Sequence, residues 1–199
     1  HWVFATDMQL SSRDFINKTR EIELKKGLSI GGAQKNTLLI GGPCSVESEE
    51  QIRSASQLLK DLNLSVLRGG CYKPRTSPYS FQGMGLEGLQ LLSKMRDEFG
   101  HLIISEVRDA THVDEIITHT DIIQIGAKAM YDQGILRACA KTQKPVMIKR
   151  GFGTTLQEFV QAAEFILSGG NSNVILCERG IRTFETKTRF TLDLCGVAW

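Results

Sequence analysis

Residues 102–151, LIISEVRDATHVDEIITHTDIIQIGAKAMYDQGILRACAKTQKPVMIKRG, contain the pattern that decides the fold. Three short apolar runs, LIISE (102–106), DIIQI (121–125) and PVMIK (145–149), alternate with two stretches of helical character. Consecutive apolar residues predict strands that are buried on both faces, which is typical of a parallel sheet. Strands that alternate with helices predict parallel neighbours joined by right-handed crossovers.

The same alternation continues on both sides of this stretch. Further apolar runs are TLLIG (37–41), LSVLR (64–68) and NVILC (173–177), so we expect six core strands. Helical spacing predicts helices over 48–62, 85–99 and 155–166, with weaker patterns at 111–118 and 132–141. Ser48 with Gln51 and Thr155 with Glu158 have the spacing of capping boxes. Two α/β arrangements fit this repeat, an open doubly wound sheet and an eight-stranded barrel.

The first 36 residues have a different pattern. The segment EIELKKGLSIGG (21–32) alternates polar and apolar residues around Lys26-Gly27, which predicts a β-hairpin ahead of the first core strand. We therefore expect an N-terminal lead-in and hairpin over 1–36 and a (β/α) domain over 37–199.

Composition excludes several classes of protein. The chain has 199 residues, with 24 Lys and Arg against 22 Asp and Glu, so its net charge of +2 gives no sign of nucleic-acid binding. It has no apolar run of about 20 residues, so no membrane span is expected. The N-terminal residues lack the layout of a secretory signal. Five cysteines without CxxC spacing favour a reduced, cytoplasmic compartment.

Charged side chains follow nearly every expected strand. Because the active site of a parallel α/β fold lies at the carboxyl ends of its strands, these residues are expected to share one rim. They are Arg68, Lys73, Arg75, Glu106, Asp109, Lys128, Lys149, Arg150, Glu178, Arg179 and Arg182. Arginine and lysine suit carboxylate and phosphate groups. The pattern predicts a site for a substrate with several negative charges, such as a phosphorylated small molecule.

Cysteine and histidine residues are less informative. Cys44 follows the first core strand and could be an inert buried thiol or a ligand. His101, His112 and His119 lie away from the carboxyl ends of the strands, so we expect them to be surface or structural residues.

Six segments occur in the order and spacing of one enzyme family. They are GGPCSVES (41–48), LRGGCYKPRTSPYSFQG (67–83), SEVRD (105–109), QIGAK (124–128), IKRG (148–151) and CERGIRTFE (177–185). From about residue 37 onward the chain resembles the short type of 3-deoxy-D-arabino-heptulosonate-7-phosphate (DAHP) synthase. This type is related to 3-deoxy-D-manno-octulosonate-8-phosphate synthase. The KPRT string favours the heptulosonate enzyme, because the octulosonate enzyme typically has an Ala-Asn-Arg-Ser-like string after the lysine.

The resemblance implies a (β/α)8 TIM barrel, here incomplete with about six of its eight strands. It implies that phosphoenolpyruvate condenses with erythrose 4-phosphate, the first step of the shikimate pathway to chorismate and the aromatic amino acids. It also implies a divalent metal ion (Mn, Fe, Co or Zn), with Cys44 as its cysteine ligand. The expected assembly is a homo-oligomer, either a dimer or a tetramer.

Family roles transfer to individual residues of this chain. Arg68, Lys73, Lys149 and Arg179 match residues that contact phosphoenolpyruvate, and Arg75 and Thr76 match the erythrose-phosphate side. Glu106 and Gln124 line the same pocket, and Lys73 and Glu106 are the expected catalytic residues. Lys128 stands where the family usually has an arginine; it keeps the charge but lacks the bidentate fork.

The remaining metal ligands of the family, a His, a Glu and an Asp, would lie beyond Trp199. A polypeptide that ends there is therefore expected to be inactive alone. Two alternatives stay open at this point. One is an octulosonate synthase that uses arabinose 5-phosphate as acceptor. The other is a non-catalytic remnant that binds phosphorylated metabolites or a partner synthase.

Overall fold

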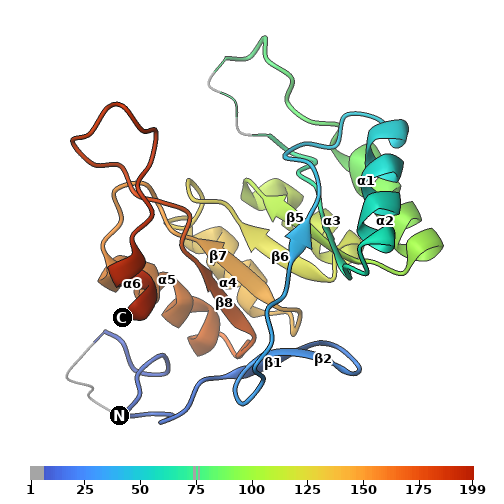
Figure 1. The fold of residues 1–199 in the computed structure, drawn as a ribbon. Helices are drawn as coiled ribbons and strands as arrows, with labels where there is room; N and C mark the ends of the chain where they lie inside the picture. Colours follow the sequence, from blue (N-terminus) through green and yellow to red (C-terminus); the bar gives the residue numbers. More distant parts are fainter. Residues whose placement is uncertain (1–6, 74, 76) are drawn as a thin grey trace.

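A curved sheet of six parallel strands forms the centre of the computed structural model, which describes residues 7–73, 75 and 77–199 (Figure 1). The strands follow one another in space in sequence order: β3 (Ile40–Gly41), β4 (Val66–Arg68), β5 (Leu102–Val107), β6 (Ile122–Ile125), β7 (Val146–Lys149) and β8 (Val174–Cys177). A doubly wound sheet reverses its strand order at a switch point. The observed sequential order is that of a barrel, which confirms the expected incomplete barrel.

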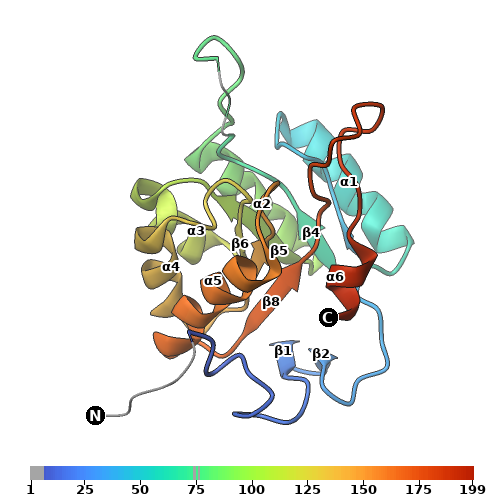
Figure 2. The same cartoon turned by 90° about the vertical axis from the view of Figure 1, so that its left-hand side faces the viewer.

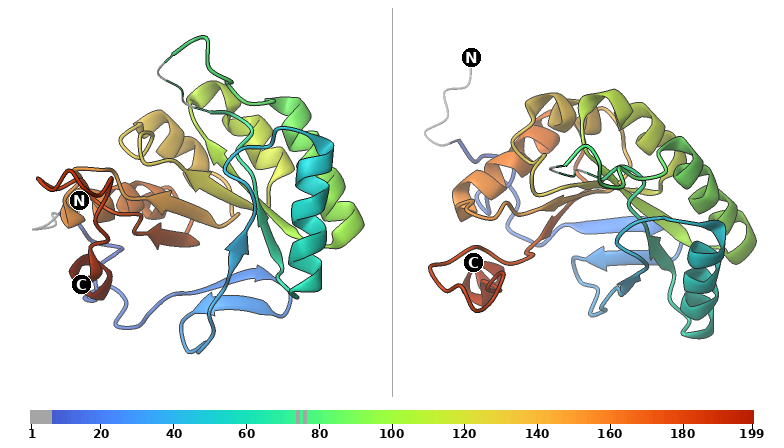
Figure 3. Two further views of the ribbon diagram at one scale, coloured as in Figure 1. Left: turned by 45° about the horizontal axis from the view of Figure 1, so that its top comes forward. Right: turned by 90° about the horizontal axis from the view of Figure 1, so that it is seen from above.

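The helices lie along the convex face of this sheet (Figure 3). They are α1 (Glu49–Asp61), α2 (Leu86–Phe99), α3 (Val113–His119), α4 (Gln133–Ala140) and α5 (Leu156–Ser168), and each coincides with a helical pattern in the sequence. A 3-10 turn, η1 (Ala110–His112), precedes α3, and a short helix, α6 (Leu194–Ala198), follows the loop after β8. A continuous apolar core fills the space between sheet and helices.

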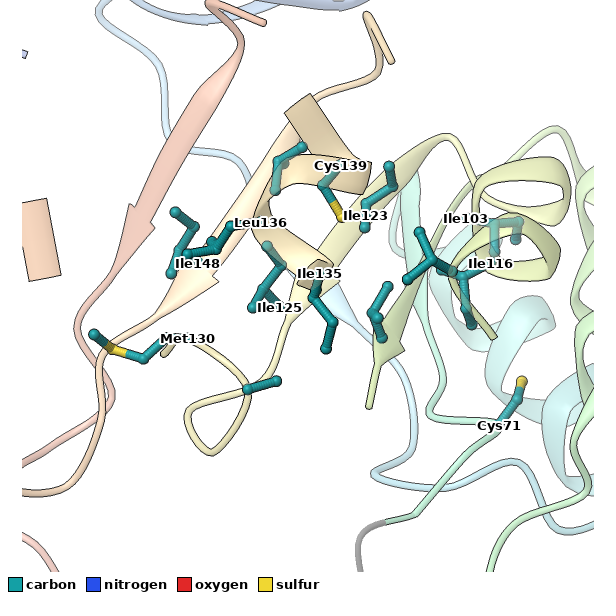
Figure 4. Close-up of a cluster of buried hydrophobic side chains, with 14 of the residues drawn as sticks. Cys71, Ile103, Ile116, Ile123, Ile125, Met130, Ile135, Leu136, Cys139 and Ile148 are labelled. Carbon is teal, nitrogen blue, oxygen red and sulfur yellow. The ribbon is translucent and has the colours of Figure 1, made fainter. Parts of the chain in front are cut away.

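Figure 4 shows part of this core. Ile123, Ile125 and Ile148 project from the strands toward Leu136 and Cys139 of α4, and all five side chains are buried. β-branched residues favour strands because they pack well on a pleated surface. The same side chains thus favour the strands and bury apolar area against the helices.

Two helix starts test the predicted capping boxes. Thr155 forms a complete box, because its hydroxyl accepts from the backbone N–H of Glu158 while the Glu158 carboxylate accepts from that of Thr155. Ser48 accepts a bond from the N–H of Gln51, but the Gln51 side chain accepts from Glu47 instead of Ser48. The box predicted at Ser48 is therefore only half present.

The interior of the barrel is closed at the amino ends of the strands by a hairpin (Figure 2). Strands β1 (Glu21–Lys25) and β2 (Leu28–Gly31) pair antiparallel around Lys26-Gly27, which confirms the predicted hairpin. Ile22 and Leu24 of β1 are buried in one cluster with inward-facing residues of the barrel strands, namely Val66, Leu102, Ile104, Ile122 and Met147.

The lead-in before the hairpin is attached to the barrel by polar contacts. The carboxylate of Glu164 on α5 accepts hydrogen bonds from the backbone N–H of Leu10 (2.7 Å) and from the N–H of Ser11 (3.0 Å). It also accepts one from the Ser11 hydroxyl (2.7 Å). Among the described helices, none is long and apolar enough to cross a bilayer.

The hairpin contact gives a stability prediction. Replacing Ile22 with Ala removes a buried side chain from the barrel interior, which should lower the free energy of unfolding by about 2–4 kcal/mol. The control is Glu23→Ala, because Glu23 is exposed on the same strand and should change stability by less than about 0.5 kcal/mol. Urea denaturation measures both. Equal stability of the two variants would mean that the hairpin does not stabilise the barrel.

Candidate functional site

The last inward-facing position of each strand from β4 to β8 carries a polar side chain or a thiol. Side chains two residues apart share one face of a strand. Two residues earlier on each strand, toward its amino end, the same face carries the apolar residues Val66, Ile104, Ile122, Met147 and Ile175. The last inward-facing positions themselves carry Arg68, Glu106, Gln124, Lys149 and Cys177. The strands thus bring these residues together at the mouth of the barrel.

Glu106 is at the centre of one hydrogen-bonded group. Its Oε2 accepts a bond from Gln124 Nε2 and another from Lys149 Nζ, each at 2.5 Å. Charge-assisted bonds of this kind are short and strong, and the pair is only partly exposed. A Cβ atom at Gly126 would lie 2.5 Å from Glu106 Oε1, so a glycine is needed there for the carboxylate to occupy its place.

Lys73 and Cys44 form a second group. Lys73 Nζ donates to the Cys44 carbonyl oxygen at 2.7 Å and lies 3.3 Å from Cys44 Sγ. Lys73 is 9% exposed, although it belongs to the long loop after β4. A Cβ atom at Gly70 would lie 2.8 Å from that carbonyl oxygen and 3.0 Å from Lys73 Nζ. Gly70 therefore leaves room for the lysine to reach Cys44.

These charges change the acidity of the Cys44 thiol. Partial burial raises its pKa, but the hydrogen bond from Lys73 and the Lys73 charge lower it. The charges of Arg68 and Arg75 act in the same direction, so the pKa of Cys44 lies below its ordinary value. A lowered pKa favours the thiolate, the form that binds metal ions. Cys44 is also exposed.

Arg179 follows β8 and completes the positive side of the mouth. Burial and the charge of Arg189 lower its pKa, while Cys177, Glu178 and Glu106 act against this change. Its Nη1 is buried and has no hydrogen-bond partner among the described residues. A buried donor without an acceptor costs about 1–3 kcal/mol. An anionic ligand oxygen at this atom would remove that cost.

Cys177 belongs to the same interior and was not among the residues predicted for the site. Burial raises the pKa of this thiol, and the charges of Lys149, Arg179 and Arg68 partly oppose the increase. The sequence does contain a signal for it. Cys177 follows Ile175 by two residues, so both side chains lie on the inner face of the strand.

Other expected rim residues have different environments. Lys128 and Arg75 are exposed, and in the described part of the chain Lys128 has no hydrogen bond or ion pair with the other site residues. Thr76 lies outside the described residues. Arg150 is buried and bonds to Glu178 at 2.8 Å and Asp193 at 2.7 Å. It ties the start of α6 to the sheet and does not form part of an open cationic rim.

His101, His112 and His119 have local partners. His101 is buried with Nε2 3.0 Å from the Ser56 carbonyl oxygen, and His119 Nδ1 lies 3.0 Å from the Ser93 hydroxyl. The ring of His112 stacks on Tyr72, with centroids 3.9 Å apart. These contacts fit the structural role expected of them.

Cys44 has the properties of one metal ligand. Its thiol is exposed and its pKa is lowered, which suits a thiolate bond to a divalent cation. Within residues 7–73, 75 and 77–199, no group of three or more His, Cys, Asp or Glu side chains could hold a metal ion. Among the described residues, Cys44 is thus a candidate for one ligand, and they do not provide a complete coordination sphere.

Comparisons with known proteins identify the family of the chain. A family model described as "DAHP synthetase I family" matches residues 18–199. A phospho-2-dehydro-3-deoxyheptonate aldolase of Thermotoga maritima is 43% identical over 189 residues, which cover 95% of this chain and 55% of that protein. A 2-dehydro-3-deoxyphosphooctonate aldolase of Bordetella petrii is 33% identical over 162 residues, or 75% of this chain and 57% of that protein.

A solved structure shows the same fold. The crystal structure of the Thermotoga maritima DAHP synthase superposes with a TM-score of 0.89 at 41% identity, over 96% of this chain and 54% of that one. The chain therefore spans about half the length of the relatives it matches.

The Cys44–Lys73 contact predicts a pH dependence. Lys73→Met removes a hydrogen bond and a charge that favour the thiolate, so the pKa of Cys44 should rise. The midpoint of its reaction with iodoacetamide should then move to higher pH, measured on the Cys44 peptide by mass spectrometry with a chelator present. Lys128→Met removes an exposed charge of the same rim and is the control. Identical midpoints in the wild type and Lys73→Met would contradict the assigned contact.

Proposed function

The chain belongs to the DAHP synthetase I family, and on that premise we propose that it serves the condensation of phosphoenolpyruvate with erythrose 4-phosphate. The observation that carries this proposal is the convergence of Arg68, Lys73, Lys149 and Arg179 on one end of the barrel. They come from three different strands or the loops that follow them. Cations gathered in this way suit a small substrate with more than one anionic group.

Phosphoenolpyruvate fits the inner part of the mouth. It carries a carboxylate and a phosphate, and the inward-facing residues include two cations, Arg68 and Lys149, with Arg179 beside them. Glu106 balances one of these charges through Lys149, which leaves the group positive. Nη1 of Arg179 has no hydrogen-bond partner among the described residues, which supports binding of an anionic oxygen there.

The proposed reaction is aldol-like. C3 of phosphoenolpyruvate attacks the aldehyde carbon of erythrose 4-phosphate, water adds at C2, and phosphate leaves by cleavage of the C2–O bond. Lys73 gives its proton to the alkoxide formed from the aldehyde oxygen, which makes the new hydroxyl group. Glu106 is the carboxylate of the cluster that can accept the proton released by the adding water. A divalent cation at Cys44 would polarise the aldehyde as a Lewis acid.

The acceptor side of the site is proposed for the loop after β4. Arg75 is exposed there, and its charge reaches Cys44, so it lies on the open side of the inner cations. Together with Thr76 it would hold the phosphate of erythrose 4-phosphate. A homo-oligomer and a cytoplasmic location remain part of the proposal.

The first test measures binding of phosphoenolpyruvate by isothermal titration calorimetry. Lys149→Met should weaken binding by about tenfold or more, because a charge-assisted hydrogen bond contributes about 1.5–3 kcal/mol. Lys141→Met is the control, since Lys141 is exposed at the end of α4, at the opposite end of the barrel. No binding by the wild type, or equal losses in both variants, would contradict the assigned phosphoenolpyruvate site.

The second test concerns the acceptor. The complex with phosphoenolpyruvate is titrated with erythrose 4-phosphate and, separately, with arabinose 5-phosphate. We expect tighter binding of erythrose 4-phosphate, and Arg75→Ala should weaken it about tenfold while leaving phosphoenolpyruvate affinity within about twofold. A preference for arabinose 5-phosphate would instead support the octulosonate reaction.

A further inference from the structure

The guanidinium group of Arg179 lies against two aromatic rings. Its Cζ is 4.1 Å from the ring centroid of Phe190 and 4.7 Å from that of Phe152. The two rings stack on each other, with centroids 5.1 Å apart and planes inclined by 21°. A planar cation over an aromatic face is attracted by the negative face of the ring. These contacts therefore favour the stacked orientation of Arg179.

More cations surround the same pair of rings. Arg182 Cζ lies 5.9 Å from the centroid of Phe152, and Arg189 Cζ lies 5.1 Å from that of Phe190. Three guanidinium groups so close together repel one another. The cation–π attraction of the Phe152 and Phe190 rings offsets part of this repulsion energy. The two phenylalanines thus allow a local density of positive charge that a purely aliphatic lining would not stabilise.

Backbone hydrogen bonds hold the main chain at or beside both phenylalanines. The chain leaves β8, makes an excursion over 181–191 and closes it with an antiparallel bridge, in which Ile181 and Thr191 exchange N–H···O bonds of 2.8 and 2.9 Å. Phe190 is the residue before this closure. Phe152, in the loop after β7, is held because its carbonyl oxygen accepts from the N–H of Arg182 at 2.8 Å.

Gly180 makes the approach of Phe190 possible. Its φ of 93° is in the left-handed region that favours glycine. A Cβ atom at this position would lie 2.9 Å from the Cβ of Phe190. The glycine directly after Arg179 therefore provides the space in which the ring lies beside the guanidinium.

We propose that Phe152 and Phe190 are positioning residues, which hold Arg179 so that its buried Nη1 stays free for an anionic oxygen of phosphoenolpyruvate. A free arginine loses rotamer entropy when it is fixed by a ligand. The stacked rings impose that order before the ligand arrives, which improves affinity through preorganisation. This inference rests on the proposed binding of phosphoenolpyruvate at Arg179.

The test compares leucine and tyrosine at position 190. Phe190→Leu keeps apolar bulk but removes the aromatic face, so the Kd for phosphoenolpyruvate should rise about three- to tenfold. Phe190→Tyr keeps the face and should bind within about twofold of wild type. Phe184→Leu is the matched control, because Phe184 lies in the same loop and is 98% exposed. Calorimetry gives the Kd and thermal melting reports the fold. If Phe190→Leu melts early, Phe152→Leu replaces it.

A double-mutant cycle with Arg179→Gln separates the two proposals. If Arg179→Gln leaves the Kd unchanged, the assigned role of Arg179 in the proposed function is wrong. If it weakens binding, adding Phe190→Leu should cause little further loss, because the ring acts through the arginine. Full additivity, wild-type affinity of Phe190→Leu, or an equal loss in the leucine and tyrosine variants would overturn the positioning role.

Discussion

Each strand of a parallel barrel has one face toward the interior, and only every second side chain can use it. In this chain the inward-facing side chains form two layers. An apolar layer lies toward the amino ends of the strands, and a charged layer lies toward their carboxyl ends. Ile104 and Met147 lie in the lower layer, whereas Glu106 and Lys149 lie one inward position higher. The hairpin β1–β2 covers the apolar layer from below. The charged layer is thus left at the open end, where loops and solvent meet it.

Three cations at this mouth are each compensated by a different kind of contact. Lys149 is paired with Glu106, and Lys73 donates to the carbonyl oxygen and thiol of Cys44. Arg179 is stacked on aromatic rings. Repulsion between unit charges a few ångströms apart is large in a partly desolvated site, so such compensation is required before a ligand binds. It leaves enough uncompensated charge to favour an anion.

Much of the fold was predictable from local patterns, whereas most side-chain pairing was not. Strands buried on both faces are short apolar runs, and the hairpin at Lys26-Gly27 has a period of two, so both were predicted correctly. The capping box predicted at Ser48 was half wrong, because the Gln51 side chain accepts from the N–H of Glu47 instead of that of Ser48. Arg150 resembled a rim cation because its partner Asp193 lies 43 residues away. A contact between residues so distant in sequence depends on the loop conformation.

The aromatic residues at Arg179 had no sequence signal at all. Phe152 and Phe190 lie in loops, without the periodicity that identifies core positions, and their use depends on the bridge between Ile181 and Thr191. The family resemblance identified the arginine but not what supports it. Geometry was needed because the two rings come from loops after different strands.

Neighbouring residues at the ends of β7 and β8 have different roles. Lys149 faces the mouth while its neighbour Arg150 is tied to Glu178, and Glu178 is itself the neighbour of Arg179. Inserting or deleting one residue in β7 would exchange the inward and outward positions of the strand residues on one side of the change. Insertions and deletions among homologues should therefore lie in the connecting loops, whereas the alternation of inward and outward side chains along these strands should be preserved.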